Sequence, residues 1–232
     1  MLKIFIAIST FNRKNITKLC LENLEKIVAN DKNSKLVIYD DASTSYGEDF
    51  LKQYSRDVLR FRSSGGIERS RARSFRDFIY IYENYDLFYM TDNDTIHDPD
   101  FLKVLRNLYS TSSEKFEKKL PIGLYNSVFH QNPKNIIFEN NVLSVRKTCP
   151  GVSQCFDRDM VKKMIDFINK NPVYETLYGF DYHWPASLGV PFLQTQTSYL
   201  EHFARDKTEK GIHSSYTPDD PLKDFDRDRA LS

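Results

Sequence analysis

Three short apolar runs, each ending in acidic or hydroxyl residues, constrain the fold of this chain more than any other feature. They are "KIFIAIS" at 3–9, "KLVIYDD" at 35–41 and "DLFYMTD" at 86–92. Continuous β-prone apolar runs are typical of strands buried on both faces of a parallel sheet. Segments with helical spacing separate them, so strand and helix alternate. This order predicts an α/β fold with a Rossmann-like, mostly parallel central sheet flanked by helices.

The helices expected around these runs follow from apolar spacing. Residues 14–30 place Leu24, Ile27 and Val28 on one stripe, and 66–85 have a basic first half and an aromatic second half. The segment 98–110 begins with Pro99, which is favoured in the first helical turn. A short helix at 47–54 and a third strand at 58–64 complete this region.

The second part of the chain is less regular. Strands are expected at 122–131 and 190–203, and a hairpin at 135–147 that turns through "ENN". A helix at 158–171 should stop at Pro172. We therefore expect one domain with two regions, 1–105 and a smaller sheet region at 106–216, and a mobile polar tail at 217–232.

Composition excludes several classes of protein. The 232 residues carry a formal net charge of +1, which argues against nonspecific nucleic-acid binding. No apolar run approaches the length of a membrane span, and the N-terminal run lacks a signal-peptide cleavage site. The cysteines Cys20, Cys149 and Cys155 lack metal-ligand spacing, which suits buried thiols in a reducing cytoplasm. A Cys149–Cys155 disulfide is compatible with the sequence, but nothing demands it.

Two aspartates, Asp92 and Asp94, end the third run. An EF-hand calcium loop is excluded, because Ile96 and His97 stand where that loop needs an oxygen ligand and a glycine. An Asp-X-Asp pair at a strand end can instead hold one divalent cation and leave other positions to phosphate oxygens. An acidic turn that caps the next helix is an equally good interpretation of these two residues alone.

Two further polar segments belong to the same edge, since parallel strands present their carboxyl ends together and ligands bind there. In "VIYDDAST" one acid can accept the N3–H of a uracil or contact a ribose; the alternative is an Asx turn. In "SSGGIERSRARSF" the pair Gly65–Gly66 precedes a helix with Arg69, Arg71 and Arg73, which suits a diphosphate. A solvated basic face is the alternative.

The order of these segments resembles the nucleotide-binding half of family 2 glycosyltransferases of the GT-A fold. The matching pieces are "ISTFNR", "VIYDDAST", "GGIERSRA" and "FYMTDNDTIHDPDFL", over roughly the first 105 residues. The resemblance implies an inverting transferase that uses a nucleoside diphosphate sugar, with UDP expected, and Mn²⁺ or Mg²⁺. It implies nucleotide-binding roles for these residues: Ser9, Thr10, Phe11, Arg13, Asp41, Gly66, Arg71 and Asp92.

The second half shows weaker likeness to the same family. "CPGVSQCFDRDMV" resembles its acceptor-side turn, which includes Gly151, and "LYGFDYHWPASLG" resembles its Gly-Glu-Asp segment. This implies that Asp181 is the general base, with Tyr182 and Trp184 beside the acceptor. Phe180 replaces the family's Glu, so Glu175 is the fallback base. "SYLEHF" resembles a closing strand that ends in a metal-binding histidine, which gives a metal set of Asp92, Asp94 and His202.

The resemblance further implies a saccharide, glycolipid or other hydroxyl acceptor. It also implies a bacterial-type role in surface polysaccharide or glycolipid assembly, in the cytoplasm near the inner face of the membrane, with peripheral membrane association. Three alternatives stay open. A nucleotidyltransferase would share the fold class, but "STFNRKN" lacks the expected glycines. A non-catalytic sugar-nucleotide-binding protein would lack a working base. A sugar transferase acting on nucleic acid would show salt-dependent DNA affinity.

Overall fold

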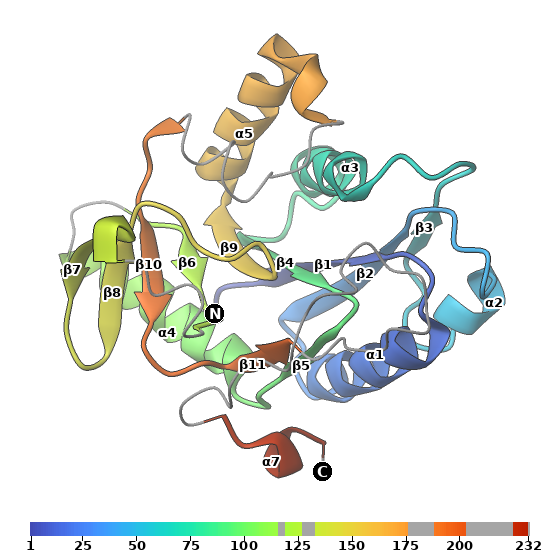
Figure 1. Ribbon diagram of the computed structural model, residues 1–232, viewed down its shortest axis with the longest axis horizontal. Helices are drawn as coiled ribbons and strands as arrows, with labels where there is room; N and C mark the ends of the chain where they lie inside the picture. Colours follow the sequence, from blue (N-terminus) through green and yellow to red (C-terminus); the bar gives the residue numbers. More distant parts are fainter. Residues whose placement is uncertain (116–118, 127–132, 176–187, 203–224, 232) are drawn as a thin grey trace.

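The computed structural model describes residues 1–115, 119–126, 133–175, 188–202 and 225–231 (Figure 1). Its strands form one nine-stranded sheet, in the order β3-β2-β1-β4-β9-β6-β10-β8-β7, and one two-stranded sheet, β11-β5. Within these residues no helix is long and apolar enough to cross a lipid bilayer. The α/β fold with helices flanking a large sheet is confirmed.

The first four strands of the large sheet are parallel, as the sequence predicts. They are β1 (Ile4–Thr10), β2 (Ser34–Asp40), β3 (Val58–Arg60) and β4 (Leu87–Asp92). In the register of β1, Ser9 lies opposite Asp92 of β4 and Thr10 lies opposite Asp40 of β2. The polar ends of three strands therefore meet at one edge of the sheet.

Helices cover both faces of this sheet. On one face α1 (Lys14–Ala29) and α4 (Phe101–Lys115) pack in one core cluster with Ile4, Ile6 and Ile8 of β1. On the other face α3 (Ile67–Tyr80) and α5 (Arg158–Lys170) pack in a second cluster with Phe5 and Ala7 (Figure 1). Because successive side chains of a strand point to opposite faces, an uninterrupted apolar run serves both clusters. A short helix, α2 (Glu48–Leu51), follows β2.

The rest of the large sheet is mixed. The strand β9 (Ser153–Asp157) pairs antiparallel with β4, and β6 (Ile122–Gly123) joins it to β10 (Phe192–Thr195). The predicted hairpin is confirmed as β7 (Ile136–Glu139) and β8 (Leu143–Arg146). The strand β9 was not predicted from the sequence, because its Ser, Gln and Asp residues give no apolar run although the strand is buried in the sheet.

Two short strands and two 3-10 turns lie outside the large sheet and the main helices. The strand β5 (Thr95–His97) pairs antiparallel with β11 (Leu200–His202), so the predicted strand at 190–203 is divided between the two sheets. Two 3-10 turns occupy Pro133–Asn135 and Pro172–Glu175, and α5 ends before Pro172 as expected.

Of the predicted mobile tail at 217–232, only residues 225–231 are among the described residues, so its mobility stays a prediction. Residues 227–231 form the helix α7 (Arg227–Leu231), in which Ala230 is buried. The guanidinium of Arg229 pairs with Asp98 and Asp100, and Asn23 donates a hydrogen bond to the Ala230 carbonyl at 2.9 Å. Polar composition suggested a tail, but specific hydrogen bonds and ion pairs hold this part against the fold. The three cysteines are buried and free, as the sequence favoured.

Candidate functional site

The carboxyl end of β1 presents one exposed ring and two buried hydroxyls. Phe11 is 38% exposed, so its ring is available to a ligand. The Ser9 hydroxyl lies 2.9 Å from that of Ser70, on α3. The Thr10 hydroxyl donates to Asp40 at 3.0 Å and is turned away from solvent. Of the predicted β1 contacts, Phe11 is therefore the one best placed to meet a base.

The loops after β1 and β2 are tied together through Asn12. Its side-chain oxygen accepts hydrogen bonds from the backbone N–H groups of Thr44 (2.8 Å) and Ser45 (3.1 Å), and its own N–H donates to the Ser43 hydroxyl. Asn12, Arg13 and Ala42 have φ angles of 52°, 58° and 61°. Left-handed backbone in residues other than glycine is costly and clusters at functional sites.

Asp41 organises the glycine turn before α3. Its carboxylate accepts hydrogen bonds from the Ser64 hydroxyl (2.6 Å) and from the N–H groups of Gly65 and Gly66 (2.9 Å each). Gly66 has a φ of 88°, a region that favours glycine, and it is the N-cap of α3. The predicted partners Asp41 and Gly66 are thus brought together at the edge of the sheet.

Arg71 lies beside Asp92 at the end of β4. Its side chain is fully buried, and its guanidinium donates to the carbonyls of Ala7 (3.3 Å) and Thr91 (2.7 Å) and to the Asp92 carboxylate. Its predicted contact with a diphosphate stays a prediction. Burial lowers the pKa of Arg71, and Asp92 opposes that shift. Arg71 holds Asp92 in place.

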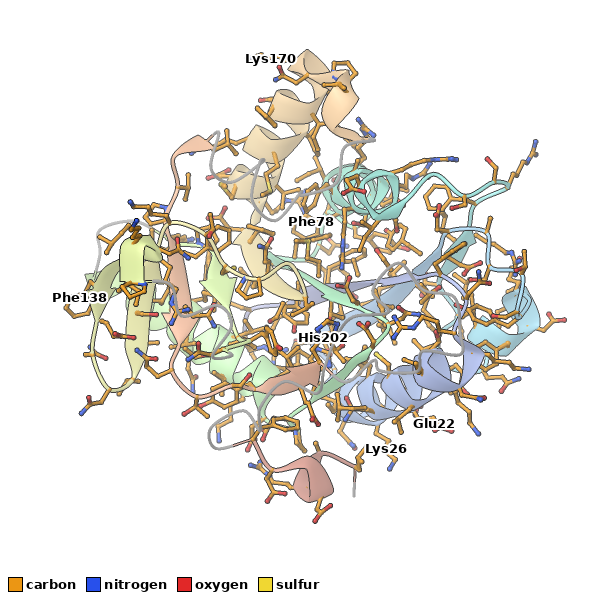
Figure 2. The ribbon with its side chains drawn as sticks, in the orientation of Figure 1. Glu22, Lys26, Phe78, Phe138, Lys170 and His202 are labelled. Carbon is orange, nitrogen blue, oxygen red and sulfur yellow. The ribbon has the colours of Figure 1, made fainter. Side chains whose placement is uncertain are left out.

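Asp92, Asp94 and His202 converge at the end of β4. The Asp94 carboxylate contacts Arg13 Nη1 at 2.9 Å and His202 Nε2 at 3.1 Å. The antiparallel pairing of β11 with β5 places His202 opposite Thr95, one residue beyond Asp94. Figure 2 shows His202 near the centre of the molecule, where β11 approaches the end of β4. The predicted trio is therefore assembled by pairing across 108 residues of sequence (202 − 94).

The charges of this trio are mutually stabilised. Burial raises the pKa of Asp92, and Arg71 offsets this only in part. Burial also opposes ionisation of Asp94, but His202 and Arg13 outweigh it and hold its pKa below the ordinary value. For His202 burial favours the neutral ring, yet Asp94 and then Asp92 raise its pKa above the ordinary value. Each carboxylate of the site is thus paired with a cationic or imidazole side chain.

The donor atoms suit a divalent cation, although the described residues by themselves do not form a complete ligand set. Two carboxylates and one imidazole are ligands that Mn²⁺ accepts, and Mg²⁺ accepts the carboxylates. Among the residues that the structure describes, no group of three or more His, Cys, Asp or Glu side chains is arranged to hold a metal ion. The reason is visible in the contacts: Arg71, Arg13 and His202 occupy carboxylate oxygens of Asp92 and Asp94.

Only some of the residues predicted on the acceptor side belong to the described part of the chain. Asp181, Tyr182 and Trp184 lie outside the described residues. Glu175 ends a 3-10 turn, and its side chain is not described. Gly151 is buried in the turn that leads into β9.

Ser64 and Ser70, which contact Asp41 and Ser9, were not predicted from the sequence. Ser64 directly precedes the glycine turn, which was the available signal for it, whereas Ser70 lies within α3.

Comparison with known proteins agrees with this geometry. Residues 5–114 match the family described as glycosyl transferase family 2. A search of curated proteins gave no match.

Similar folds occur in solved structures of low sequence identity. TarS 1-349 of S. aureus in complex with UDP-GlcNAc has a TM-score of 0.60 at 14% identity, over 93% of this chain and 62% of that one. The mannosyltransferase PcManGT of Pyrobaculum calidifontis, in complex with GDP-Man and Mn²⁺, has a TM-score of 0.55 at 13% identity, over 82% and 53%. A197 from STIV has a TM-score of 0.51 at 15% identity, over 88% and 86%. The chain spans 37–62% of the length of the TarS chains it matches.

Proposed function

Residues 5–114 belong to glycosyl transferase family 2, and on this premise we propose that the protein transfers a sugar from a nucleoside diphosphate sugar to a hydroxyl acceptor. The reaction is metal-dependent and inverts the anomeric centre, and the donor is a UDP sugar. The observation that carries the proposal is the convergence of Asp92, Asp94 and His202 at the end of β4, beside the segments that contain Asp41 and Gly66.

The strand-end residues would share the work of holding the donor. Asp92, Asp94 and His202 would hold Mn²⁺ or Mg²⁺, which supplies positive charge to the diphosphate leaving group. Asp41 would contact the base, and Ser9 and the exposed ring of Phe11 would frame it. The N-terminus of α3, which begins after Gly66, favours negative charge and so suits the diphosphate.

Arg71 and Arg13 act through the aspartates. Arg71 binds Asp92, which fixes the carboxylate and offsets part of the rise in its pKa that burial causes. Arg13 binds Asp94 from the N-cap position of α1. Both contacts place the carboxylates before any ligand arrives, which lowers the reorganisation that binding requires.

On the acceptor side, the attacking hydroxyl must lose its proton as its oxygen bonds to the anomeric carbon. In a single displacement that proton passes to a carboxylate, for which we take Asp181 with Glu175 as the fallback. The bond from the anomeric carbon to the diphosphate oxygen breaks in the same step, and the electron pair leaves with the nucleotide. Gly151, Tyr182 and Trp184 would line the acceptor.

The setting that suits this reaction is the assembly of a surface polysaccharide or a glycolipid of bacterial type. A saccharide or glycolipid acceptor would place the protein in the cytoplasm, against the inner face of the membrane. Two neighbours of the same fold were crystallised with nucleotide sugars, which supports the donor class.

Calorimetric titration with UDP, with and without Mn²⁺, tests the proposal. Wild type should bind UDP in a metal-dependent manner, and Asp94→Ala should abolish that binding. Asp166→Ala removes the same charge from an exposed position on α5 and is the matched control. GDP, CDP and dTDP are titrated in parallel, since the neighbours bind different bases.

Binding of another nucleotide in place of UDP would overturn the uridine assignment. Failure of all four nucleotides would overturn the proposal. Nucleotide binding without any transfer to saccharide or lipid acceptors would favour a non-catalytic binding protein.

A further inference from the structure

One face of α1 carries polar side chains where a buried helix face is usually apolar. Thr17, Cys20 and Asn23 follow Arg13 at spacings of four, three and three residues, so they lie along one stripe of the helix. Thr17 is fully buried and Asn23 is 5% exposed. The outer face, with Glu22 and Lys26, points into solvent (Figure 2). Burying polar groups is costly unless they are hydrogen-bonded, so these residues need a structural reason.

The N-terminal part of the stripe, Arg13 and Thr17, contacts the Asp-X-Asp segment. Arg13 pairs with Asp94 at 2.9 Å. The Thr17 hydroxyl accepts a hydrogen bond from Asn93 Nδ2 at 2.6 Å and donates one to the Asn12 carbonyl at 3.0 Å. Thr17 thereby joins the residue between the two aspartates to the loop after β1.

The C-terminal part of the stripe, Cys20 and Asn23, contacts the backbone at Asp92 and the strand β5. The Cys20 thiol lies 3.5 Å from the Asp92 carbonyl and 3.7 Å from the Thr95 hydroxyl. Asn23 accepts a hydrogen bond from the His97 N–H at 2.8 Å and donates to the His97 carbonyl at 3.1 Å. Through the Ala230 carbonyl, Asn23 also connects this strand to α7.

The stripe therefore contacts the segment 92–97 at Asp92, Asn93, Asp94, Thr95 and His97. We propose that Thr17 and Asn23 are positioning residues: they fix the backbone of 92–97 against α1 so that the Asp92 and Asp94 carboxylates face one point. This inference rests on the proposed function, since it assigns to α1 the geometry of the metal and nucleotide site. Neither residue touches the ligand.

Variants that remove hydrogen bonds, compared with matched variants elsewhere, separate a positioning role from a packing role. Thr17→Val keeps the shape but removes both hydrogen bonds, and Thr17→Ser keeps the hydroxyl. Asn23→Ala removes three side-chain hydrogen bonds. Thr195→Val and Asn135→Ala are the matched controls: Thr195 is 4% exposed, and Asn135 also makes three side-chain hydrogen bonds, all with Thr148.

Two readouts are measured on the full chain. The first is the affinity for Mn²⁺ with UDP, by calorimetry and by the electron paramagnetic resonance signal of bound Mn²⁺. The second is amide hydrogen exchange of the peptide that covers 92–97, without metal or nucleotide. Thr17→Val and Asn23→Ala should weaken binding by about tenfold or more, as loss of groups that orient metal ligands does. Exchange should be faster at 92–97, and Thr17→Ser should restore both readouts.

The outcomes separate this inference from the proposed function. The inference is overturned if Thr17→Val and Asn23→Ala bind Mn²⁺ and UDP as tightly as wild type and show unchanged hydrogen exchange at 92–97. This holds whatever their melting temperatures are. An equal loss of affinity in Asn135→Ala would also overturn it, because the effect would then be general destabilisation; an equal loss in Thr195→Val would show that the methyl-for-hydroxyl change itself is responsible. If wild type binds no nucleotide, the proposed function fails, and hydrogen exchange alone decides whether α1 fixes the segment.

Discussion

The parallel and the mixed parts of the large sheet place their buried polar groups differently. In the parallel part the strand interiors are apolar, and the buried polar residues Ser9, Thr10 and Asp40 stand at strand ends. In the mixed part Gln154 and Gln194 are fully buried within strands. Each glutamine donates to a backbone carbonyl, yet its side-chain oxygen has no hydrogen-bond partner in the described part of the chain.

The difference shows that a polar side chain can make different contacts at the end of a strand than within it. At a strand end, several loops meet, so one side chain can connect them, as Asn12 connects the loops after β1 and β2. Within a strand, a side chain reaches only its neighbours on the same face of the sheet. The four predictions below test this contrast, from the largest expected effect to the smallest.

Arg71→Met should cause the largest loss of stability. It leaves the Asp92 carboxylate, whose side chain is 19% exposed, without the fully buried cation that pairs with it; loss of one partner of a buried pair typically costs about 3–5 kcal/mol. Urea denaturation measures the free energy of unfolding. Arg73→Met is the control on the same helix: its side chain is 46% exposed and pairs with Asp77, and such pairs contribute about 1 kcal/mol or less. Equal effects of the two substitutions would contradict the role assigned to Arg71.

The two site-proximal histidines should give opposite pH dependences of stability. Burial lowers the pKa of His97 to about 3 from 6.5, so between these values the unfolded chain binds the extra proton and stability falls with acid. The slope approaches about 1.4 kcal/mol per pH unit. The raised pKa of His202 has the opposite sign: its contribution is present below pH 6.5 and is lost as pH rises.

Urea unfolding of wild type and of His97→Phe at pH 7, 6 and 5 isolates the first effect. Phenylalanine suits the site because the His97 ring packs against Phe101 and Tyr89. The variant should lose less stability than wild type between pH 7 and 5, by about 2 kcal/mol. Parallel pH profiles would show that His97 is protonated in the folded chain.

Gly66→Ala should destabilise the glycine turn. The φ of 88° is costly for a residue with a Cβ, by about 1–2 kcal/mol. Gly47→Ala is the control, because Gly47 is also a helix N-cap but has a φ of −106° and open space around its Cβ position. Denaturation curves should separate the two variants. A Gly66→Ala chain as stable as Gly47→Ala would argue against backbone strain at this turn.

The same substitution at two buried threonines should act with opposite sign. Thr17→Val removes two hydrogen bonds at the strand ends and should destabilise by about 1–2 kcal/mol. Thr195 lies within β10, and its hydroxyl has no hydrogen-bond partner in the described residues. Thr195→Val should therefore leave stability unchanged or raise it by up to about 1 kcal/mol. Thermal melting of both variants measures the change in stability that each substitution causes. Equal destabilisation by the two would contradict the expected difference.

Much of the parallel part could be predicted from sequence, because its signals are local. Apolar runs placed β1, β2 and β4, and the residues directly after them placed Asp41, Gly66, Asp92 and Asp94 at one edge. The strand β9 could not be predicted, because its polar residues are buried by neighbouring strands and not by any pattern of its own. The helix α7 was missed for a similar reason, since its contacts are with Asn23, Asp98 and Asp100.

By itself, the sequence determined which side chains stand at the strand ends, because the alternation of apolar strands and helices dictates a parallel sheet with one polar edge. The tertiary structure alone decided how these side chains pair. It paired Arg71 with Asp92, and it brought His202 to Asp94 through β5 and β11. Direction of a side chain and contact between distant segments depend on packing in three dimensions, which no local pattern contains.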